Sequence, residues 1–177
     1  APDEIYSKTA QDFVTIADKA SENYIITALK REFLHIGFLA EESGFEASTS
    51  DLFWIIDPLD GTKNFIHQIP MFCVSIGLKQ GDHVLFGMVY HPITKELFYA
   101  EKGKGAFLND KALSITKNLD VSKAIIATGF PFKKREMIPT FFACFEHLFN
   151  GITSARRCGS AALDLSYVAA GRFDAFF

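Results

Sequence analysis

The sequence predicts a mixed α and β fold. Apolar, β-branched stretches of strand length, separated by turn residues, fill the middle of the chain. Apolar residues recur at helical spacing near its beginning and in its last third. With 177 residues, of which 49% are hydrophobic, the chain can bury a substantial core, and we expect a single domain over residues 1–177.

The first predicted elements lead from a helix to a buried strand. Residues 17–34 have an amphipathic helical pattern, and the short apolar segment 38–40 then runs into Glu41. A polar loop is expected over 43–51. The next apolar segment, 53–56, predicts a buried strand with Asp57 at its end, and Pro58 should stop that strand because proline has no N–H for a strand ladder.

The central block predicts an antiparallel meander. Its strands, 72–78, 84–90 and 96–100, are separated by two segments typical of turns, 80–82 and 91–94. Strands that follow one another through short turns pair as antiparallel neighbours.

The last third predicts one short strand and two helices. The strand covers 124–128 and the helices cover 138–149 and 161–170. The first helix carries Phe141 and Phe145 on one apolar face, which favours a core or subunit contact over a ligand platform. The second is rich in small residues and could pack closely against a sheet.

Charge and cysteine content exclude several functions. The formal net charge of −3 gives no polyanion-binding signature, and the basic run 133–135 is typical of a solvated helix entry, so we expect no direct nucleic acid binding. Three cysteines without metal-ligand spacing favour reduced thiols in a cytoplasmic protein. No signal-peptide pattern and no apolar run near the ~20 residues of a membrane span occur, so no membrane association is expected.

The segment Trp-Ile-Ile-Asp-Pro-Leu-Asp-Gly-Thr-Lys-Asn-Phe, residues 54–65, predicts a site for Mg²⁺ and phosphate. Asp57 falls at the end of a strand and Asp60 lies three residues on, so both carboxylates can face one point and offer hard oxygen ligands. Gly61 permits close backbone approach, and Thr62 can begin a helix whose free N–H groups would receive a phosphate. An Asp-Pro turn followed by an Asp N-cap is the structural alternative for the same residues.

These residues resemble the first signature of the inositol monophosphatase family, WxxDPxDGTxNF, at all of its defined positions. A second family motif resembles residues 159–161 through 168–174, and further matches occur at 12–18 and 41–44. Segments 128–132 and 156–165 are most similar to the bacterial, SuhB-like branch. The resemblance covers nearly the whole chain and implies an α+β fold, a layered αβαβα sandwich of the inositol monophosphatase/fructose-1,6-bisphosphatase type.

The resemblance implies a site that holds two or three Mg²⁺ ions. Glu41, Asp57 and the Leu59 carbonyl would bind the activating ion, and Asp57 with Asp60 would hold a second. Thr62, paired with Asp18, would orient the attacking water and take up its proton. The structural alternative for Asp18 is a carboxylate at a helix N-terminus, where the helix dipole favours it.

The same resemblance implies the substrate contacts. The residues that would contact the phosphate or the sugar alcohol are Glu41, Leu59, Asp60, Gly61, Thr62, Arg156, Gly159, Ser160 and Ala161. Arg156 is equally open to a structural pairing with a neighbouring carboxylate. Cys158 lies beside the second motif, and we expect a spectator thiol there rather than a nucleophile.

Family chains begin with a further helix and continue, beyond the last matched motif, to a Trp-Asp pair and a final lobe. The Trp-Asp carboxylate is the third protein ligand of the second metal. The resemblance therefore implies that these 177 residues are a partial phosphatase domain, truncated at both ends, without the C-terminal lobe and that ligand.

Three functions remain open from the sequence. The first is Mg²⁺-dependent, lithium-sensitive hydrolysis of myo-inositol monophosphates by a homodimer. The second is the same chemistry on fructose 1,6-bisphosphate, a 3′-phosphoadenosine nucleotide or histidinol phosphate. The third is a binding role, because SuhB-like proteins also associate with the transcription machinery.

Overall fold

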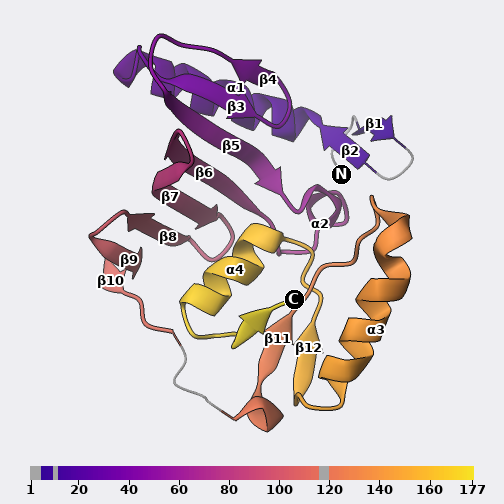
Figure 1. Ribbon diagram of the computed structural model, residues 1–177. Helices are drawn as coiled ribbons and strands as arrows, with labels where there is room; N and C mark the ends of the chain where they lie inside the picture. The colour runs from indigo at the N-terminus through magenta and orange to yellow at the C-terminus, as the bar shows by residue number, and fades with distance from the viewer. Residues whose placement is uncertain (1–4, 10–11, 116–119) are drawn as a thin grey trace.

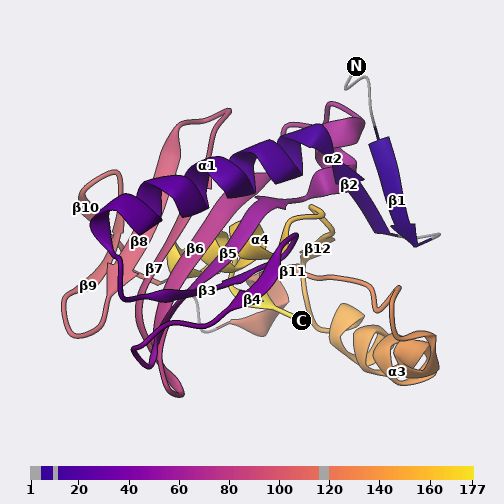
Figure 2. The same ribbon diagram turned by 90° about the horizontal axis from the view of Figure 1, so that it is seen from above.

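The computed structural model describes residues 5–9, 12–115 and 120–177 and has the layered arrangement of a helix, a sheet, a helix, a sheet and a helix (Figure 1). Helix α1 (Ile16–Glu32) covers one face of a large sheet, and α4 (Ala161–Ala169) lies against the other face. A small sheet and α3 (Ile138–Phe149) complete the stack (Figure 2). The predicted mixed α and β fold is confirmed, and each of the three long helices begins within one residue of its predicted start.

The large sheet has eight strands. In spatial order they are β10 (Lys111–Ala112), β9 (Gly105–Leu108), β8 (Glu96–Glu101), β7 (His83–His91), β6 (Cys73–Gln80), β5 (Leu52–Asp60), β3 (Gly37–Ala40) and β4 (Gly44–Glu46). The run from β5 to β9 is antiparallel, as the meander prediction required. Strand β3 pairs parallel with β5, which brings the end of β3 beside the end of β5.

Two predictions about this sheet were wrong. The expected polar loop contains β4, which pairs with β3 through backbone hydrogen bonds that polar side chains do not prevent. Pro58 does not stop β5. The register to β6 shifts between Asp57 and Asp60, so the proline sits in an irregularity where no ladder N–H is needed.

The small sheet comes from short strands of the last third, of which the sequence predicted one. It contains β12 (Ser154–Arg156), β11 (Ile125–Ala127) and β13 (Ala175–Phe176), all parallel and in that order. Strands of two or three residues carry too little pattern to be predicted. The remaining elements are β1 (Ile5–Thr9), β2 (Asp12–Thr15), α2 (Thr62–Ile66) and the 3₁₀ turns η1 (Val121–Lys123) and η2 (Arg135–Met137).

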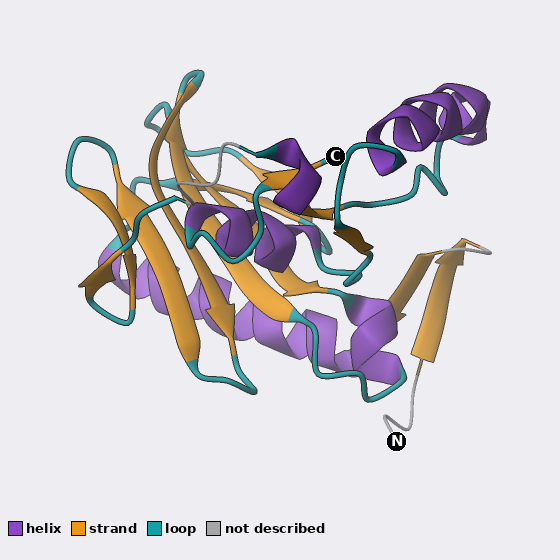
Figure 3. Cartoon of the chain, turned by 90° about the horizontal axis from the view of Figure 1, so that it is seen from below, coloured by secondary structure: helices purple, strands orange, loops and turns teal. Residues whose placement is uncertain are grey.

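The main core lies between α1 and the large sheet (Figure 3). Phe38, Trp54 and Ile56 are almost fully buried there, and Ile25 and Leu29 of α1 pack against them. Burying apolar side chains of this size contributes about 1.5–3 kcal/mol each. This core fixes β5, which carries Asp57, and β3, which ends directly before Glu41, under one helix.

Helix α3 keeps part of its apolar face exposed. Phe141 and Phe145 stack on each other and against Phe177, whereas Phe142 and Phe149 remain 52% and 62% exposed. The prediction that this apolar face packs in a core is therefore only partly confirmed within the described residues. Among the helices that the structure describes, none combines the length and the apolar character that crossing a membrane requires.

Candidate active site

The end of β5 supplies two of the predicted metal ligands. Asp57 pairs with Ser75 of β6, and Asp60 pairs with Cys73 after the register shift. The Leu59 N–H donates to Asp57 Oδ1 at 3.1 Å, which fixes the turn between the two carboxylates. The irregularity that Pro58 creates therefore sets the spacing of this acidic pair.

Glu41 lies beside Asp57 because β3 and β5 run parallel. The Glu41 N–H donates to the Ile56 carbonyl at 3.1 Å, and the Glu41 and Asp57 side chains are hydrogen-bonded. Burial, together with the nearby charges of Glu41 and Asp60, raises the pKa of Asp57 to about 7. Three carboxyl groups thus crowd one end of the sheet, and Asp57 resists ionisation without a cation.

Asp60 is held at the start of α4. Its Oδ2 accepts from Ser160 Oγ and from the Ala162 N–H, both at 2.7 Å. Ser160 is the N-cap of α4 and is 1% exposed, so its hydroxyl positions Asp60 rather than reaching solvent. The substrate contact expected of Ser160 remains a prediction, while its link to Asp60 was not foreseen.

Thr62 and Asp18, 44 residues apart, meet across the site. Thr62 Oγ1 lies 3.2 Å from Asp18 Oδ1 and 3.1 Å from the Leu59 carbonyl. Asp18 is 3% exposed, and its Oδ2 accepts from the Thr15 N–H at 2.8 Å and from Thr15 Oγ1 at 2.5 Å in a capping box. Asp18 therefore caps α1, as the structural alternative required, and it also contacts Thr62. Its role toward the attacking water stays a prediction.

Two glycines allow the site segments to approach each other. Gly61 has φ +96°, and a Cβ there would lie 2.8 Å from the Met71 carbonyl oxygen. Gly159 has φ +94°, and a Cβ there would lie 2.8 Å from Asn64 Nδ2. Asn64 Nδ2 donates to the Met71 carbonyl at 2.6 Å and to the Cys158 carbonyl at 2.9 Å, which joins α2 to the start of α4.

Glu22 is a site-forming residue that sequence reasoning missed. It lies on α1, is 3% exposed, and accepts the N–H groups of Glu42 and Ser43 at 2.8 Å each. These are the two amides that directly follow Glu41. A carboxylate in the middle of a helix carries no sequence signal for this role, because its partners lie 20 residues away.

Arg156 and the cysteines take no catalytic position. Arg156 is exposed at the end of β12, where it contacts Ser154 Oγ and the Ala155 carbonyl. Burial raises the pKa of Cys73 to about 12 and that of Cys158 to about 11, so both thiols stay protonated. Cys73, Cys144 and Cys158 are all free, as the sequence predicted.

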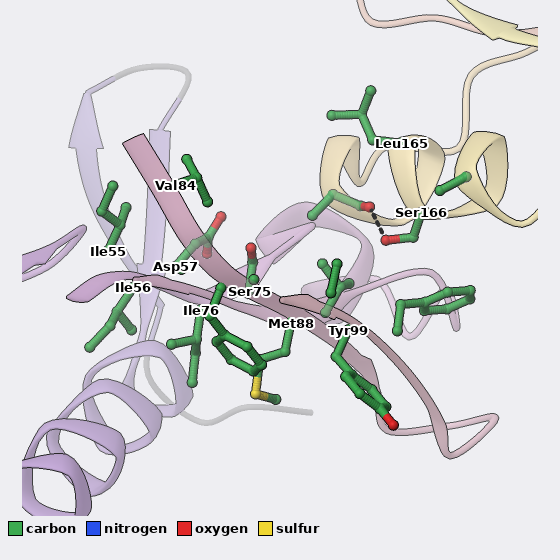
Figure 4. A pocket seen from close by; sticks show the side chains of 18 of the residues that line it. Ile55, Ile56, Asp57, Ser75, Ile76, Val84, Met88, Tyr99, Leu165 and Ser166 are labelled. Carbon is green, nitrogen blue, oxygen red and sulfur yellow. Dashed lines mark hydrogen bonds between the residues drawn. The ribbon is translucent and has the colours of Figure 1, made fainter. Parts of the chain in front are cut away.

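Two hollows adjoin these residues. A cleft of about 480 Å³ includes Asp60, Gly61, Thr62 and Gly159 in its lining. A groove of about 720 Å³ lies between the large sheet and α4, where Asp57 and Ser75 are polar side chains among apolar ones (Figure 4). The predicted site residues thus separate into a polar cleft and the edge of an apolar groove.

The candidate ligand atoms are of the kind that Mg²⁺ prefers. The Glu41, Asp57 and Asp60 carboxylates and the Leu59 carbonyl offer oxygen only, and the raised pKa of Asp57 shows that a positive charge would be favoured there. Within the described residues, no three His, Cys, Asp or Glu side chains are already arranged as a metal cage. The Asp57 side chain is hydrogen-bonded to Glu41, and the Asp60 side chain is held by Ser160 and Ala162 at the start of α4.

The layered α and β fold is that of the inositol monophosphatase and fructose 1,6-bisphosphatase structures, and it brings carboxylates at a strand end beside a Thr–Asp pair. A model of the inositol monophosphatase family matches residues 3–177. The chain belongs to that family.

Similar proteins cover nearly all of this chain. The "Nus factor SuhB" of Pasteurella multocida is 44% identical over 171 residues, which are 96% of this chain and 64% of that protein. The "Inositol-1-monophosphatase" of Caulobacter vibrioides is 43% identical over 177 residues, 98% of this chain and 69% of that protein. A crystal structure of extragenic suppressor protein suhB from Bartonella henselae superposes with a TM-score of 0.94 at 40% identity, over 98% of this chain and 67% of that one. The chain thus spans about two thirds of the length of these relatives.

Proposed function

We propose that the protein to which this chain belongs is a Mg²⁺-dependent phosphoric monoester hydrolase that releases phosphate from myo-inositol monophosphates. The observation that carries the proposal is the crowding of Glu41 and Asp60 around a half-buried Asp57, next to the Thr62–Asp18 hydrogen bond. Membership of the inositol monophosphatase family supports the same reaction.

Some of these residues would bind the cation, and others would move a proton. Glu41, Asp57, Asp60 and the Leu59 carbonyl would hold Mg²⁺, which when bound lowers the pKa of water and stabilises charge on the phosphate. Thr62 has one hydroxyl proton, and it can donate to the Leu59 carbonyl or to Asp18. Donation to Asp18 Oδ1 would leave the Leu59 carbonyl available to a cation and a lone pair of Thr62 Oγ1 available to accept a hydrogen bond from the attacking water.

Substrate binding would use the cleft beside these residues. Gly61 and Thr62 line it together with Gly159 at the start of α4. Their backbone N–H groups suit a phosphate and a hydroxyl-rich alcohol. The contacts expected of Ala161 and Arg156 belong to the same proposal, and the exposed Arg156 side chain would have to leave Ser154 and the Ala155 carbonyl to reach a ligand.

The substrate is proposed from the relatives' names as well as from the site. The Caulobacter relative is named an inositol-1-monophosphatase, which favours inositol monophosphates over fructose 1,6-bisphosphate or 3′-phosphoadenosine nucleotides. The exposed Phe142 and Phe149 of α3 support the proposed homodimer, because a second copy could cover them.

The test is phosphate release by the protein, expressed from its complete coding sequence, with Mg²⁺, with Mg²⁺ and Li⁺, and with chelator. We expect Mg²⁺-dependent release from myo-inositol 1-phosphate that Li⁺ inhibits and that Asp57→Asn lowers by at least 100-fold. Asp82→Asn, at an exposed turn, is the matched control and should keep full activity. Release that survives chelator, or Asp57→Asn, would overturn the proposal.

A second candidate is a binding role in transcription, which the name "Nus factor SuhB" of the Pasteurella relative favours. Copurification with RNA polymerase from native extract tests it. An Asp60→Asn protein without hydrolysis that still copurifies would separate this role from catalysis.

A further inference from the structure

Asn64 occupies a defined position of the first signature motif, and the proposed reaction gives it no role. It lies in the short helix α2 and is half-buried. Its Nδ2 group donates to the Met71 carbonyl at 2.6 Å and to the Cys158 carbonyl at 2.9 Å. An amide nitrogen has two hydrogens, so both donors are used, and each holds a different segment of the chain.

The Met71 end of this bridge packs against Gly61. A Cβ at Gly61 would lie 2.8 Å from the Met71 carbonyl oxygen and 3.2 Å from Phe72 Cα, so the two backbone segments are in contact. Phe72 also packs edge-to-face against Phe65 of α2, with ring centroids 5.2 Å apart. The place of Met71 and Phe72 therefore determines where Gly61 lies in the cleft.

The Cys158 end of the bridge leads directly to Gly159. A Cβ at Gly159 would lie 2.8 Å from Asn64 Nδ2 and 3.1 Å from Asn64 Oδ1, so this backbone lies against the amide group itself. Gly61 and Gly159 both line the cleft of about 480 Å³. One side chain thus connects two glycines of the cleft that are far apart in the sequence.

We propose that Asn64 is a positioning residue that sets the distance between the phosphate-binding and alcohol-binding parts of the cleft, and that it thereby selects which alcohols fit. The inference rests on the proposed phosphatase function, in which Gly61 contacts the phosphate and Gly159 contacts the sugar alcohol. A rigid ring must reach both contacts at once, so its binding depends on their separation. A small, flexible alcohol can adjust to a change in that separation.

The alternative is that the two hydrogen bonds only stabilise the fold, and Asn109 provides a matched example of such a bridge. Asn109 lies in the turn between β9 and β10, outside the lining of the cleft. Its Oδ1 accepts from the Leu97 N–H at 2.8 Å, and its Nδ2 donates to the Lys95 carbonyl at 3.3 Å. Its removal should therefore affect stability without affecting the choice of substrate.

The test measures kcat/KM for myo-inositol 1-phosphate and for glycerol 2-phosphate with the protein expressed from its complete coding sequence. In Asn64→Ala, kcat/KM should fall about 30-fold for the inositol ester, mainly through KM, and about threefold for the glycerol ester, so the preference falls about tenfold. Asn64→Asp, which keeps the shape and removes both donors, should lose the preference as well. Asn109→Ala should lower Tm and keep the preference.

The outcomes distinguish the two proposals. An unchanged preference in Asn64→Ala, including an equal loss for both esters, overturns the positioning role and leaves the phosphatase function standing. Equal hydrolysis of the two esters by the unmodified protein overturns that role as well. If Asn64→Ala does not fold, Asn64→Ser, which keeps one donor, should show an intermediate preference, and the full preference would overturn the role. No hydrolysis of either ester by the unmodified protein overturns both proposals.

Discussion

At the scale of single residues, the carboxylates of the site differ in whether one of their oxygens already accepts hydrogen bonds at the start of a helix. Asp18 and Asp60 have one oxygen fixed by a helix start, at α1 and α4 respectively. Asp57 is half-buried beside Glu41 and has a pKa raised to about 7. The first two carboxylates are therefore fixed in place by helix starts, whereas Asp57 is the group whose protonation a cation would change.

The Asp18→Asn variant should lower kcat for phosphate release by about 10²–10³-fold, because an amide cannot take up the proton that Thr62 relays. Steady-state kinetics at saturating Mg²⁺ measure this. Thr15→Ala is the comparison, since it removes the N-cap of α1 and keeps the Asp18 carboxylate. That variant should lose about 1 kcal/mol of stability and much less activity. Equal kcat losses in the two variants would contradict the role of Asp18.

The stability of the metal-free protein should fall as the pH rises through about 7. The pKa of Asp57 is raised from 3.8 to about 7 in the folded state, so the favourable contribution of its protonated form is complete below 3.8 and lost on ionisation near 7. Mg²⁺ should consequently raise Tm more at pH 8 than at pH 6. Thermal melts with chelator and with Mg²⁺ check this. An Asp57→Asn protein should lose that part of the pH slope, and an unchanged slope would refute the assignment.

At the scale of elements, helices α1 and α4 hold the site from opposite faces of the large sheet. Helix α1 provides Asp18 and, one turn later, Glu22, which binds the two amides after Glu41. Helix α4 provides the N–H and the Ser160 hydroxyl that fix Asp60. Each ligand-bearing segment is thus positioned by a helix that packs on the sheet.

Glu22→Gln should weaken Mg²⁺ activation about tenfold, because an amide can accept from only one of the Glu42 and Ser43 N–H groups through its oxygen. The loss in stability should be about 2 kcal/mol. The Mg²⁺ concentration for half-maximal activity is the measurement, and activity should recover at high Mg²⁺. Glu32→Gln, at the exposed end of α1, is the control. A stability loss without any change in the Mg²⁺ requirement would show a purely structural role for Glu22.

Gly61→Ala should destabilise the protein by about 2–4 kcal/mol. The new Cβ would require a positive φ and lie 2.8 Å from the Met71 carbonyl oxygen. Gly87→Ala is the matched control, because its Cβ would meet nothing within 4 Å, and we expect a change within about 0.5 kcal/mol. Chemical denaturation of both variants measures the difference, and similar free energies of unfolding would rule out the close approach.

At the scale of the whole molecule, an apolar groove lies between the large sheet and α4. Val84 and Leu165, on opposite sides of it, are 62% and 53% exposed. A groove of about 720 Å³ with so little polar lining is a surface that apolar groups would cover.

The 177 residues produced alone should therefore bind the dye ANS strongly at neutral pH while keeping near-UV circular dichroism. Val84→Lys should lower the fluorescence several-fold. Ile93→Lys, at an exposed position outside the groove, should leave it nearly unchanged. Weak ANS binding by the unmodified chain would mean that the groove is not accessible.

Much of the architecture could be predicted from the sequence, because long helices and meander strands carry strong periodicity. The helix at 138–149 has the predicted bounds, and the strands of the meander lie within two residues of theirs. The short strands β4, β12 and β13 could not be predicted, since two or three residues carry no period. The continuation of β5 through Pro58 depends on an irregularity with β6 that only the paired strand reveals.

The sequence by itself determined the chemistry at the end of β5, because Asp57, Asp60, Gly61 and Thr62 act within one short segment and local geometry limits what they can do. The tertiary structure alone decided which distant groups meet them. The 3.2 Å contact between Thr62 and Asp18 and the attachment of Asp60 to α4 join residues 44 to 102 positions apart. Such contacts follow from packing two helices on opposite faces of one sheet, and no local pattern encodes that packing.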